Sequence, residues 1–255
     1  MADSSVGSQR LYRGAVTRIV RATTFMLCLN GCADRDRVGT DGSPWFTEEA
    51  AARGIDFHHQ SGQSGKDEPL MFPDIMGAGA ALVDVDGDGD LDAYLVQGGS
   101  LSGPRPGGDK LANRLYFNQG GGQFVAALDP GAAADRGYGM GVTAGDYDND
   151  GRLDLYVSHL PADHPNQLFH NEGPGEDGIW LFRDVAAEAG VEGPPDSFPT
   201  WFFDYDNDGW LDLFVAGFRG TLGDVASEYL GRPHSGQLPR LYRNSGDGTF
   251  ENVTR

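Results

Sequence analysis

The stretch Asp84-Val-Asp-Gly-Asp-Gly-Asp-Leu-Asp92 places five carboxylates within nine residues. The same pattern returns as Asp146-Tyr-Asp-Asn-Asp-Gly-Arg-Leu-Asp154 and as Asp204-Tyr-Asp-Asn-Asp-Gly-Trp-Leu-Asp212. All three copies read D-x-D-x-D-G-x-L-D, with Asp at positions 1, 3, 5 and 9 and Gly at position 6. Carboxylates this close repel one another unless a cation lies among them, and alternating Asp residues before a Gly turn are typical of calcium loops. The pattern therefore predicts three Ca²⁺ sites.

In each predicted site, the Asp residues at positions 1, 3, 5 and 9 supply side-chain oxygens, and position 7 supplies its backbone carbonyl. A main-chain ligand leaves the side chain free to vary, which agrees with three different residues at position 7. The alternative is a plain Asp-Gly hairpin turn without metal, and three copies of the full ligand set count against it. The candidate metal-binding residues are Asp84, Asp86, Asp88, Asp90, Asp92, Asp146, Asp148, Asp150, Arg152, Asp154, Asp204, Asp206, Asp208, Trp210 and Asp212.

The EF-hand is the first calcium motif to test, and the sequence excludes it. An EF-hand loop needs a Glu at position 12 and a helix on each side. Position 12 is occupied here by Leu95, Val157 and Val215. The flanking runs, such as residues 80–83 and 93–96, lack a helical stripe and are rich in strand-forming residues. Each loop is therefore expected to join two strands of a hairpin, with position 9 on the returning strand.

The repeat extends beyond the loop. The loops begin 62 and then 58 residues apart, and each is followed by an Asn-ending segment, as in Arg114-Leu-Tyr-Phe-Asn118, and then by a Phe. The last such Phe opens Phe250-Glu-Asn-Val-Thr254, where the pattern begins again. About four short strands per unit, repeated at this period, are typical of a β-propeller. The sequence predicts an all-β fold, a partial β-propeller of three four-stranded blades plus the start of a fourth.

The stretch from Gly77 through the first loop to Val96 resembles an FG-GAP repeat, also called a VCBS repeat, the blade of integrin-α-type propellers. Phe46-Thr-Glu-Glu-Ala50 and Pro73-Asp-Ile-Met-Gly-Ala-Gly79 are similar to the entry segment of the cartilage acidic protein subgroup, whose chains end in an ASPIC/UnbV domain. The resemblance covers about residues 45–255. It implies a module for adhesion or for interaction with extracellular protein or carbohydrate partners.

The chain stops at Arg255 without an ASPIC/UnbV domain. Three blades alone would leave sheet edges unpaired, which favours aggregation. We therefore expect a fragment of a longer protein. A self-contained protein of three blades and closure by self-association are the alternatives.

Residues 1–32 form a predicted signal or lipoprotein leader. Four Arg residues precede the apolar run 22–29, and Leu29-Asn-Gly-Cys32 resembles a lipobox with Cys32 as the lipidated residue. Simple secretion and a leader that is not exported are the alternatives. Residues 33–45 read as a polar tether. Cys28 and Cys32 are the only cysteines, so disulfides cannot stabilise the repeat region. The expected location is extracytoplasmic.

The charge of the chain restricts its partners. Residues 1–32 carry four Arg and one Asp, a charge of +3, so the remaining residues stand at −22 against −19 for the whole chain. A domain this acidic is not expected to bind nucleic acid or an anionic membrane electrostatically. Membrane association is expected only through the lipid anchor.

The sequence favours a non-enzymatic role. It contains no nucleophile elbow, metalloprotease helix motif, P-loop or dinucleotide motif. The spacing of His159, His164 and His170 fits no zinc-finger or helical zinc pattern, so these residues are interpreted as ordinary loop histidines. The alternative function is the propeller part of an extracytoplasmic hydrolase or lyase whose catalytic portion lies elsewhere.

Overall fold

The computed structural model describes residues 44–60, 76–99, 111–160, 164–217, 222–234 and 236–254. The chain divides into two compact units, Met1–Glu49 and Ala50–Arg255, and every strand belongs to the second unit. The predicted leader, residues 1–32 with Cys32, lies outside the described residues. Of the predicted tether, residues 33–45, only residues 44 and 45 are described. No helix in the described part of the chain has the length and apolar character needed to cross a membrane.

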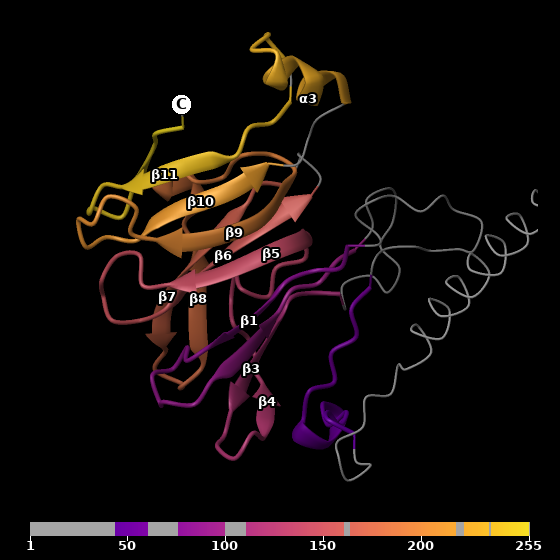
Figure 1. Cartoon of the computed structure of the whole chain (residues 1–255). Coiled ribbons are helices and arrows are strands. Elements are labelled where there is room, and N and C mark those ends of the chain that lie inside the picture. The colour runs from indigo at the N-terminus through magenta and orange to yellow at the C-terminus, as the bar shows by residue number, and fades with distance from the viewer. Residues whose placement is uncertain are drawn as a thin grey trace, which may run out of the picture. The chain divides into compact units, whose positions relative to one another are not determined.

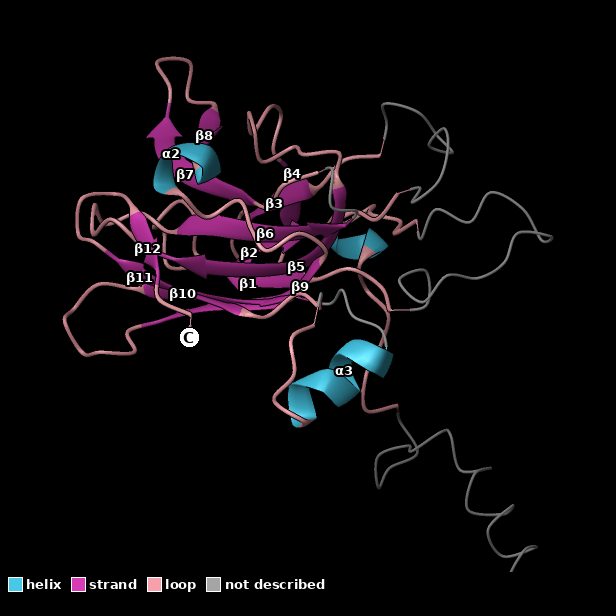
Figure 2. Ribbon diagram, turned by 90° about the horizontal axis from the view of Figure 1, so that it is seen from above, coloured by secondary structure: helices cyan, strands magenta, loops and turns pink. Residues whose placement is uncertain are grey.

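The fold consists of three four-stranded antiparallel sheets that follow one another along the chain (Figures 1 and 2). The first sheet contains β1 (Ala80–Val83), β2 (Asp92–Leu95), β3 (Arg114–Asn118) and β4 (Phe124–Ala126). The second contains β5 (Tyr138–Gly145), β6 (Asp154–Leu160), β7 (Gln167–Pro174) and β8 (Trp180–Asp184). The third contains β9 (Ser197–Phe203), β10 (Asp212–Gly217), β11 (Arg240–Asn244) and β12 (Phe250–Asn252). The three helices described are short: η1 (Ala51–Arg53), α2 (Ala186–Ala189) and α3 (Leu222–Tyr229).

Each sheet is a simple meander in which consecutive strands pair, as in a propeller blade. The three sheets do not close into a ring. The all-β partial propeller expected from the sequence is therefore confirmed, and we call the sheets blades 1, 2 and 3.

Each carboxylate loop joins the first and second strands of a blade. The loop closes on the pairs Val83↔Asp92, Gly145↔Asp154 and Phe203↔Asp212, so position 9 is the first residue of the returning strand. The hairpin expected in place of an EF-hand is confirmed, because strands flank all three loops.

Apolar side chains pack between neighbouring blades. Tyr94 and Leu115 of blade 1 lie in one buried cluster with Leu155, Val157 and Phe169 of blade 2. Burying one side chain of this size stabilises the fold by about 1.5–3 kcal/mol. The next interface repeats the arrangement, with Tyr156, Leu168, Leu213 and Val215 in one cluster. The blade-to-blade contact is therefore the core of the fold.

In blades 1 and 2, one face of the sheet packs against the next blade. The same face of blade 3 is not covered by another blade among the described residues. Phe214 and Leu241 occupy the repeat positions of Tyr156 and Leu168 and are only half-buried. They line an open groove of about 660 Å³ together with Leu238 and Val253. Trp201 stacks on Phe214, with ring centroids 4.5 Å apart. This face has the apolar character of the two buried interfaces.

The expected start of a fourth blade is wrong. Phe250–Asn252 is β12, the last strand of blade 3, and it pairs with β11 through Asn244↔Phe250 and Tyr242↔Asn252. The repeated Phe therefore ends one blade and does not open the next. The period of a repeat measures its length but does not locate the boundary between blades, which depends on pairing.

The connectors between blades explain why this Phe recurs. The connector that holds α2 packs its apolar residues in one cluster with Phe250 of the following blade. Earlier in the chain, the turn that ends η1 approaches β4 in the same way, because a Cβ added to Gly54 would meet the Phe124 carbonyl oxygen at 2.2 Å. The connector between blades 1 and 2 forms a bridge from Gly131 to Phe182 on β8. The segment before each blade thus docks on the last strand of that blade.

Candidate metal centre

The three loops share one backbone conformation. Two of the nine residues adopt left-handed φ angles, at positions 4 and 6, where Gly and Asn are the residues best tolerated. Position 4 is Gly in the first copy and Asn in the other two, and this difference preserves the conformation. The angles are 73° and 94° at Gly87 and Gly89, 56° and 89° at Asn149 and Gly151, and 61° and 91° at Asn207 and Gly209.

Backbone N–H groups hold the carboxylates at positions 1 and 5. The N–H of position 6 donates a 3.0 Å hydrogen bond to the position 1 carboxylate in every loop, as from Gly89 to Asp84. The N–H of position 7 donates to the position 5 carboxylate at 2.8–2.9 Å, as from Asp90 to Asp88. Main-chain N–H groups therefore orient these carboxylates without a bound ion.

The position 9 carboxylates are fully buried and hold the hairpin together. In the second loop, Oδ2 of Asp154 accepts from the Tyr147 N–H at 3.3 Å and Oδ1 accepts from the Asn171 N–H at 2.8 Å. Asp92 and Asp212 accept the equivalent pairs of bonds. The sequence assigned these residues only a metal-binding role. Their hydrogen bonds join the loop to the second and third strands as well.

Burial and neighbouring charge disfavour ionisation of these carboxyls. Burial, reinforced by the charges of Asp148 and Asp150, raises the pKa of Asp154 from its ordinary 3.8 to about 8, against the opposing hydrogen bonds from Asn171 and Tyr147. Burial likewise raises the pKa of Asp92 and of Asp212. A bound cation would offset this cost because it favours the charged form.

Carboxylates from each loop converge. The converging sets, with candidate ligand atoms within 4.8 Å of one another, are Asp84, Asp86 and Asp92; Asp146, Asp148 and Asp150; and Asp204, Asp206 and Asp212. Asp88, Asp154, Asp208 and the position 7 residues are not members of these three sets. Asp154 instead converges with Asp148 and His170. Oδ1 of Asp84 is buried and, among the described residues, has no hydrogen-bond partner. An all-oxygen donor set with an unsatisfied carboxylate oxygen fits a hard cation such as Ca²⁺.

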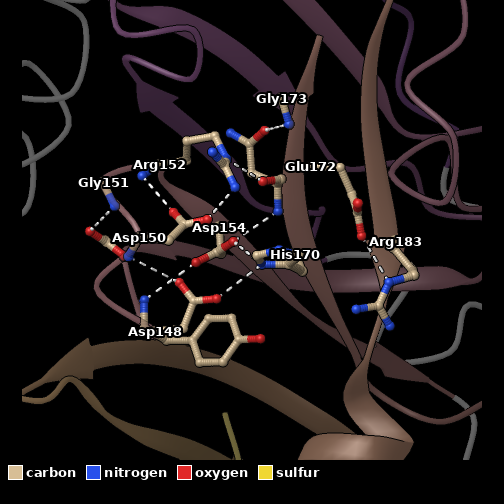
Figure 3. Close-up of polar contacts among 12 residues, drawn as sticks. Asp148, Asp150, Gly151, Arg152, Asp154, His170, Glu172, Gly173 and Arg183 are labelled. Atoms are coloured by element: carbon tan, nitrogen blue, oxygen red, sulfur yellow. Dashed lines mark hydrogen bonds and ion pairs between the residues drawn. The ribbon is translucent and has the colours of Figure 1, made fainter. Parts of the chain in front are cut away.

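The second loop also contains two basic side chains (Figure 3). Nδ1 of His170, on β7, lies 3.2 Å from Oδ1 of Asp154 and 3.4 Å from Oδ2 of Asp148, without hydrogen-bond alignment. The Arg152 guanidinium pairs with Asp150, and its Nε donates to the Asn171 carbonyl at 2.7 Å. The position 7 side chain, whose identity was expected to vary among the loops, turns back onto the loop in this copy.

The Asn that ends the third strand of each blade is a site residue that the sequence did not assign. Asn244 Nδ2 donates to the Leu211 carbonyl at 2.9 Å within blade 3 and to the Tyr147 carbonyl at 2.8 Å in the second loop. Asn171 makes the equivalent bond to the Val85 carbonyl in the first loop, at 3.1 Å. The recurrence of this Asn in all three units was the available signal.

Two of the three histidines weighed as a zinc cluster lie together, away from the loops. Asp135, His159 and His164 form a separate group whose candidate ligand atoms also lie within 4.8 Å of one another. Burial lowers the pKa of His159, partly offset by its hydrogen bond to Asp135. His170 instead belongs to the second loop. The interpretation of all three as ordinary loop histidines missed both arrangements.

One comparison with known proteins bears on this site. Residues 84–157 match the model of the FG-GAP-like repeat, a span that begins at the first loop and ends within β6. A search of curated proteins found no match to the chain. The repeat supports an FG-GAP repeat family, and such repeats suggest a propeller-type interaction module.

Proposed function

We propose that this protein is a calcium-binding β-propeller that acts as an interaction or adhesion module for an extracellular protein or carbohydrate. The observation that supports calcium binding most is the threefold recurrence of one loop geometry with converging carboxylates. The loops lie at a common end of the blades, because Asn171 reaches the first loop from β7 and Asn149 Nδ2 donates to Gly209 O across 3.5 Å between the second and third loops. A common end with an array of loops is a surface suited to recognition.

Each ion would be held by the side chains at positions 1, 3, 5 and 9 and by the carbonyl at position 7. Its role would be structural: it would neutralise the crowded carboxylates and hold the first two strands of the blade in register. Because the ion binds the folded loop, it adds stability by mass action, about 2.7 kcal/mol per site at a hundredfold excess over the dissociation constant. We propose no catalytic step at these loops.

Calorimetric titration of the chelated 255-residue chain tests this proposal. Ca²⁺ should bind, and Mg²⁺ should bind more weakly because its smaller shell requires near-octahedral geometry. Asp177→Asn should bind as much Ca²⁺ as the wild type, because Asp177 lies outside the carboxylate loops, where it accepts a turn hydrogen bond from Ile179 N at 3.0 Å. It is the control for substitutions of loop carboxylates. A chelated chain that takes up no Ca²⁺ would overturn the proposal.

The finer assignment is part of the same proposal. The entry segments favour the cartilage acidic protein subgroup, and the leader favours an extracytoplasmic protein anchored through lipid on Cys32, which lies outside the described residues. Labelling of producing cells with a fatty-acid probe should mark the wild type and Cys28→Ser but not Cys32→Ser. An unlabelled wild type would contradict the proposal that Cys32 carries a lipid anchor.

A further inference from the structure

We propose that Asp135, His159 and His164 form a site for Zn²⁺ or a similar transition-metal ion, separate from the carboxylate loops. Asp135 lies in the connector before β5, His159 near the end of β6, and His164 before β7. The site and the second loop lie at opposite ends of the β5–β6 pair, since Gly139 pairs with His159 at one end and Gly145 pairs with Asp154 at the other.

The distances between the candidate ligand atoms match a tetrahedral ion. Zinc bonds of about 2.0–2.1 Å in a tetrahedral shell place neighbouring ligand atoms about 3.3 Å apart. Nε2 of His159 lies 2.9 Å from Oδ2 of Asp135, and Nε2 of His164 lies 3.3 Å from Oδ1 of the same carboxylate. The His164 separation equals this value and the His159 separation is shorter, so a small shift of the Asp135 carboxylate away from His159 would admit an ion among the three groups.

The donor set separates this site from the calcium loops. Two imidazole nitrogens and one carboxylate suit zinc, whereas the loops converge carboxylate oxygens that suit a hard cation. Three protein ligands leave one position of a tetrahedral shell for water or a partner group. The His164 side chain is 39% exposed, so the site is open to an ion from solvent, while the His159 side chain is fully buried.

The fold orients the group from several sides. Oδ2 of Asp135 accepts a 2.7 Å hydrogen bond from the Gly137 N–H. The backbone carbonyl of Asp135 accepts a 2.8 Å hydrogen bond from the N–H of Asn113, the residue before β3 of blade 1. Nδ1 of His159 is buried and, within the described residues, has no hydrogen-bond partner. The ring of His159 thus makes its recorded polar contact only inside the cluster.

The fold does not require an imidazole at this repeat position. The equivalent residue of blade 1 is Gln97, whose Oε1 accepts from the Gln60 N–H at 2.8 Å and whose Nε2 donates to the His58 carbonyl at 3.1 Å. In blade 3 the position is Gly217. His159 is therefore a local feature of blade 2 and not part of the repeat.

A glycine leaves space for the two rings. A Cβ at residue 137 would lie 2.3 Å from Nε2 of His164 and 2.5 Å from Cδ2 of His159. The φ angle of Gly137 is not in the left-handed region, so the backbone conformation does not require a glycine here. The absence of a side chain instead leaves room for the two imidazole rings.

Zinc titration of the 255-residue chain tests the proposal. Cys28 and Cys32 are first alkylated, because thiols bind zinc, and the carboxylate loops are saturated with Ca²⁺. Calorimetry should then show uptake of one Zn²⁺, and Co²⁺ should give the intense visible absorption of a tetrahedral site. His164→Ala should weaken Zn²⁺ binding at least tenfold, whereas His58→Ala, at an exposed histidine outside the cluster, should leave it unchanged.

Gly137→Ala provides a second variant that keeps all three ligands but fills their space, and it should also weaken Zn²⁺ binding. Melting of each variant in Ca²⁺ alone, unchanged within a few degrees, shows that the fold is intact. The absence of zinc uptake by the wild type would overturn the proposal. So would unchanged affinity in both His164→Ala and Asp135→Asn, which would reduce the cluster to an ion-pair network.

Discussion

Asn244 Nδ2 donates a 2.8 Å hydrogen bond to the carbonyl of Tyr147, a residue 97 positions earlier in the loop of the neighbouring blade. Asn171 makes the same connection from blade 2 to Val85 in the first loop. Both bonds are buried, so the first and the second carboxylate loops are each tied to the third strand of the following blade. Order in a loop and packing between blades are therefore coupled.

The first prediction concerns this tie. Asn244→Ala removes the Nδ2 donor from the buried Tyr147 carbonyl and from the partly buried Leu211 carbonyl. A buried group left unsatisfied costs about 1–3 kcal/mol of unfolding free energy. Asn118→Ala is the matched control, because Asn118 Nδ2 donates to Leu91 O within its own blade and no bond to another blade is recorded for it. Urea unfolding should show the larger loss for Asn244→Ala. Equal losses of unfolding free energy in the two variants would show that the bond from Asn244 to the neighbouring blade adds no stability.

The second prediction separates metal binding from turn formation at Asp148. Asp148→Ala should lower the melting temperature in Ca²⁺, because the second site loses a ligand. It should change little in chelator, where removal of one carboxylate also relieves repulsion with Asp146 and Asp150. Melts of the wild type and the variant in both conditions give the comparison. The same destabilisation with and without Ca²⁺ would assign Asp148 to the turn.

The third prediction follows from the pKa of Asp154, which burial raises to about 8. A raised carboxyl pKa stabilises the metal-free fold fully below the ordinary value of 3.8, and this contribution is lost as pH rises through about 8. Metal-free protein should therefore melt lower at pH 8 than at pH 5.5.

Calcium favours the ionised carboxylate, so its binding should tighten with pH and release protons. Calorimetry in two buffers of different ionisation enthalpy at pH 7 measures that release. Asp154→Asn should reduce it. Calcium heats that are independent of the buffer would contradict this prediction.

The fourth prediction concerns the cation inside the second loop. Arg152 pairs with Asp150. If Ca²⁺ binds this loop as proposed, Arg152 would compete with the ion for a carboxylate and would repel it. Arg152→Gln should tighten the second site several-fold at low salt, and less at high salt as screening increases. Arg183→Gln is the control, since Arg183 pairs with Glu172 and Glu188 outside the loop. Competition with a chromophoric chelator measures the affinity, and a weaker or unchanged site in Arg152→Gln would count against the idea.

Local patterns predicted more of this molecule than distant contacts did. The D-x-D-x-D-G-x-L-D spacing predicts a hairpin because turn conformation and strand propensity act within a dozen residues, and all three hairpins are confirmed. The role of Asn244 depends on a carbonyl of the neighbouring blade, and the group around His159 depends on Asp135, 24 residues away in another connector. Such partners become neighbours only when blades pack, so spacing along the chain does not reveal them.

The most direct test of the central claim is the number of calcium ions bound per chain. Equilibrium dialysis of the chelated 255-residue chain against Ca²⁺ should give three ions. Asp86→Asn, Asp148→Asn and Asp206→Asn should each reduce the number to two at a free Ca²⁺ concentration that just saturates the wild type, while Asp177→Asn should retain three. A wild type that binds no calcium, or single-loop variants that bind as many ions as the wild type, would contradict the assignment of one structural ion to each loop.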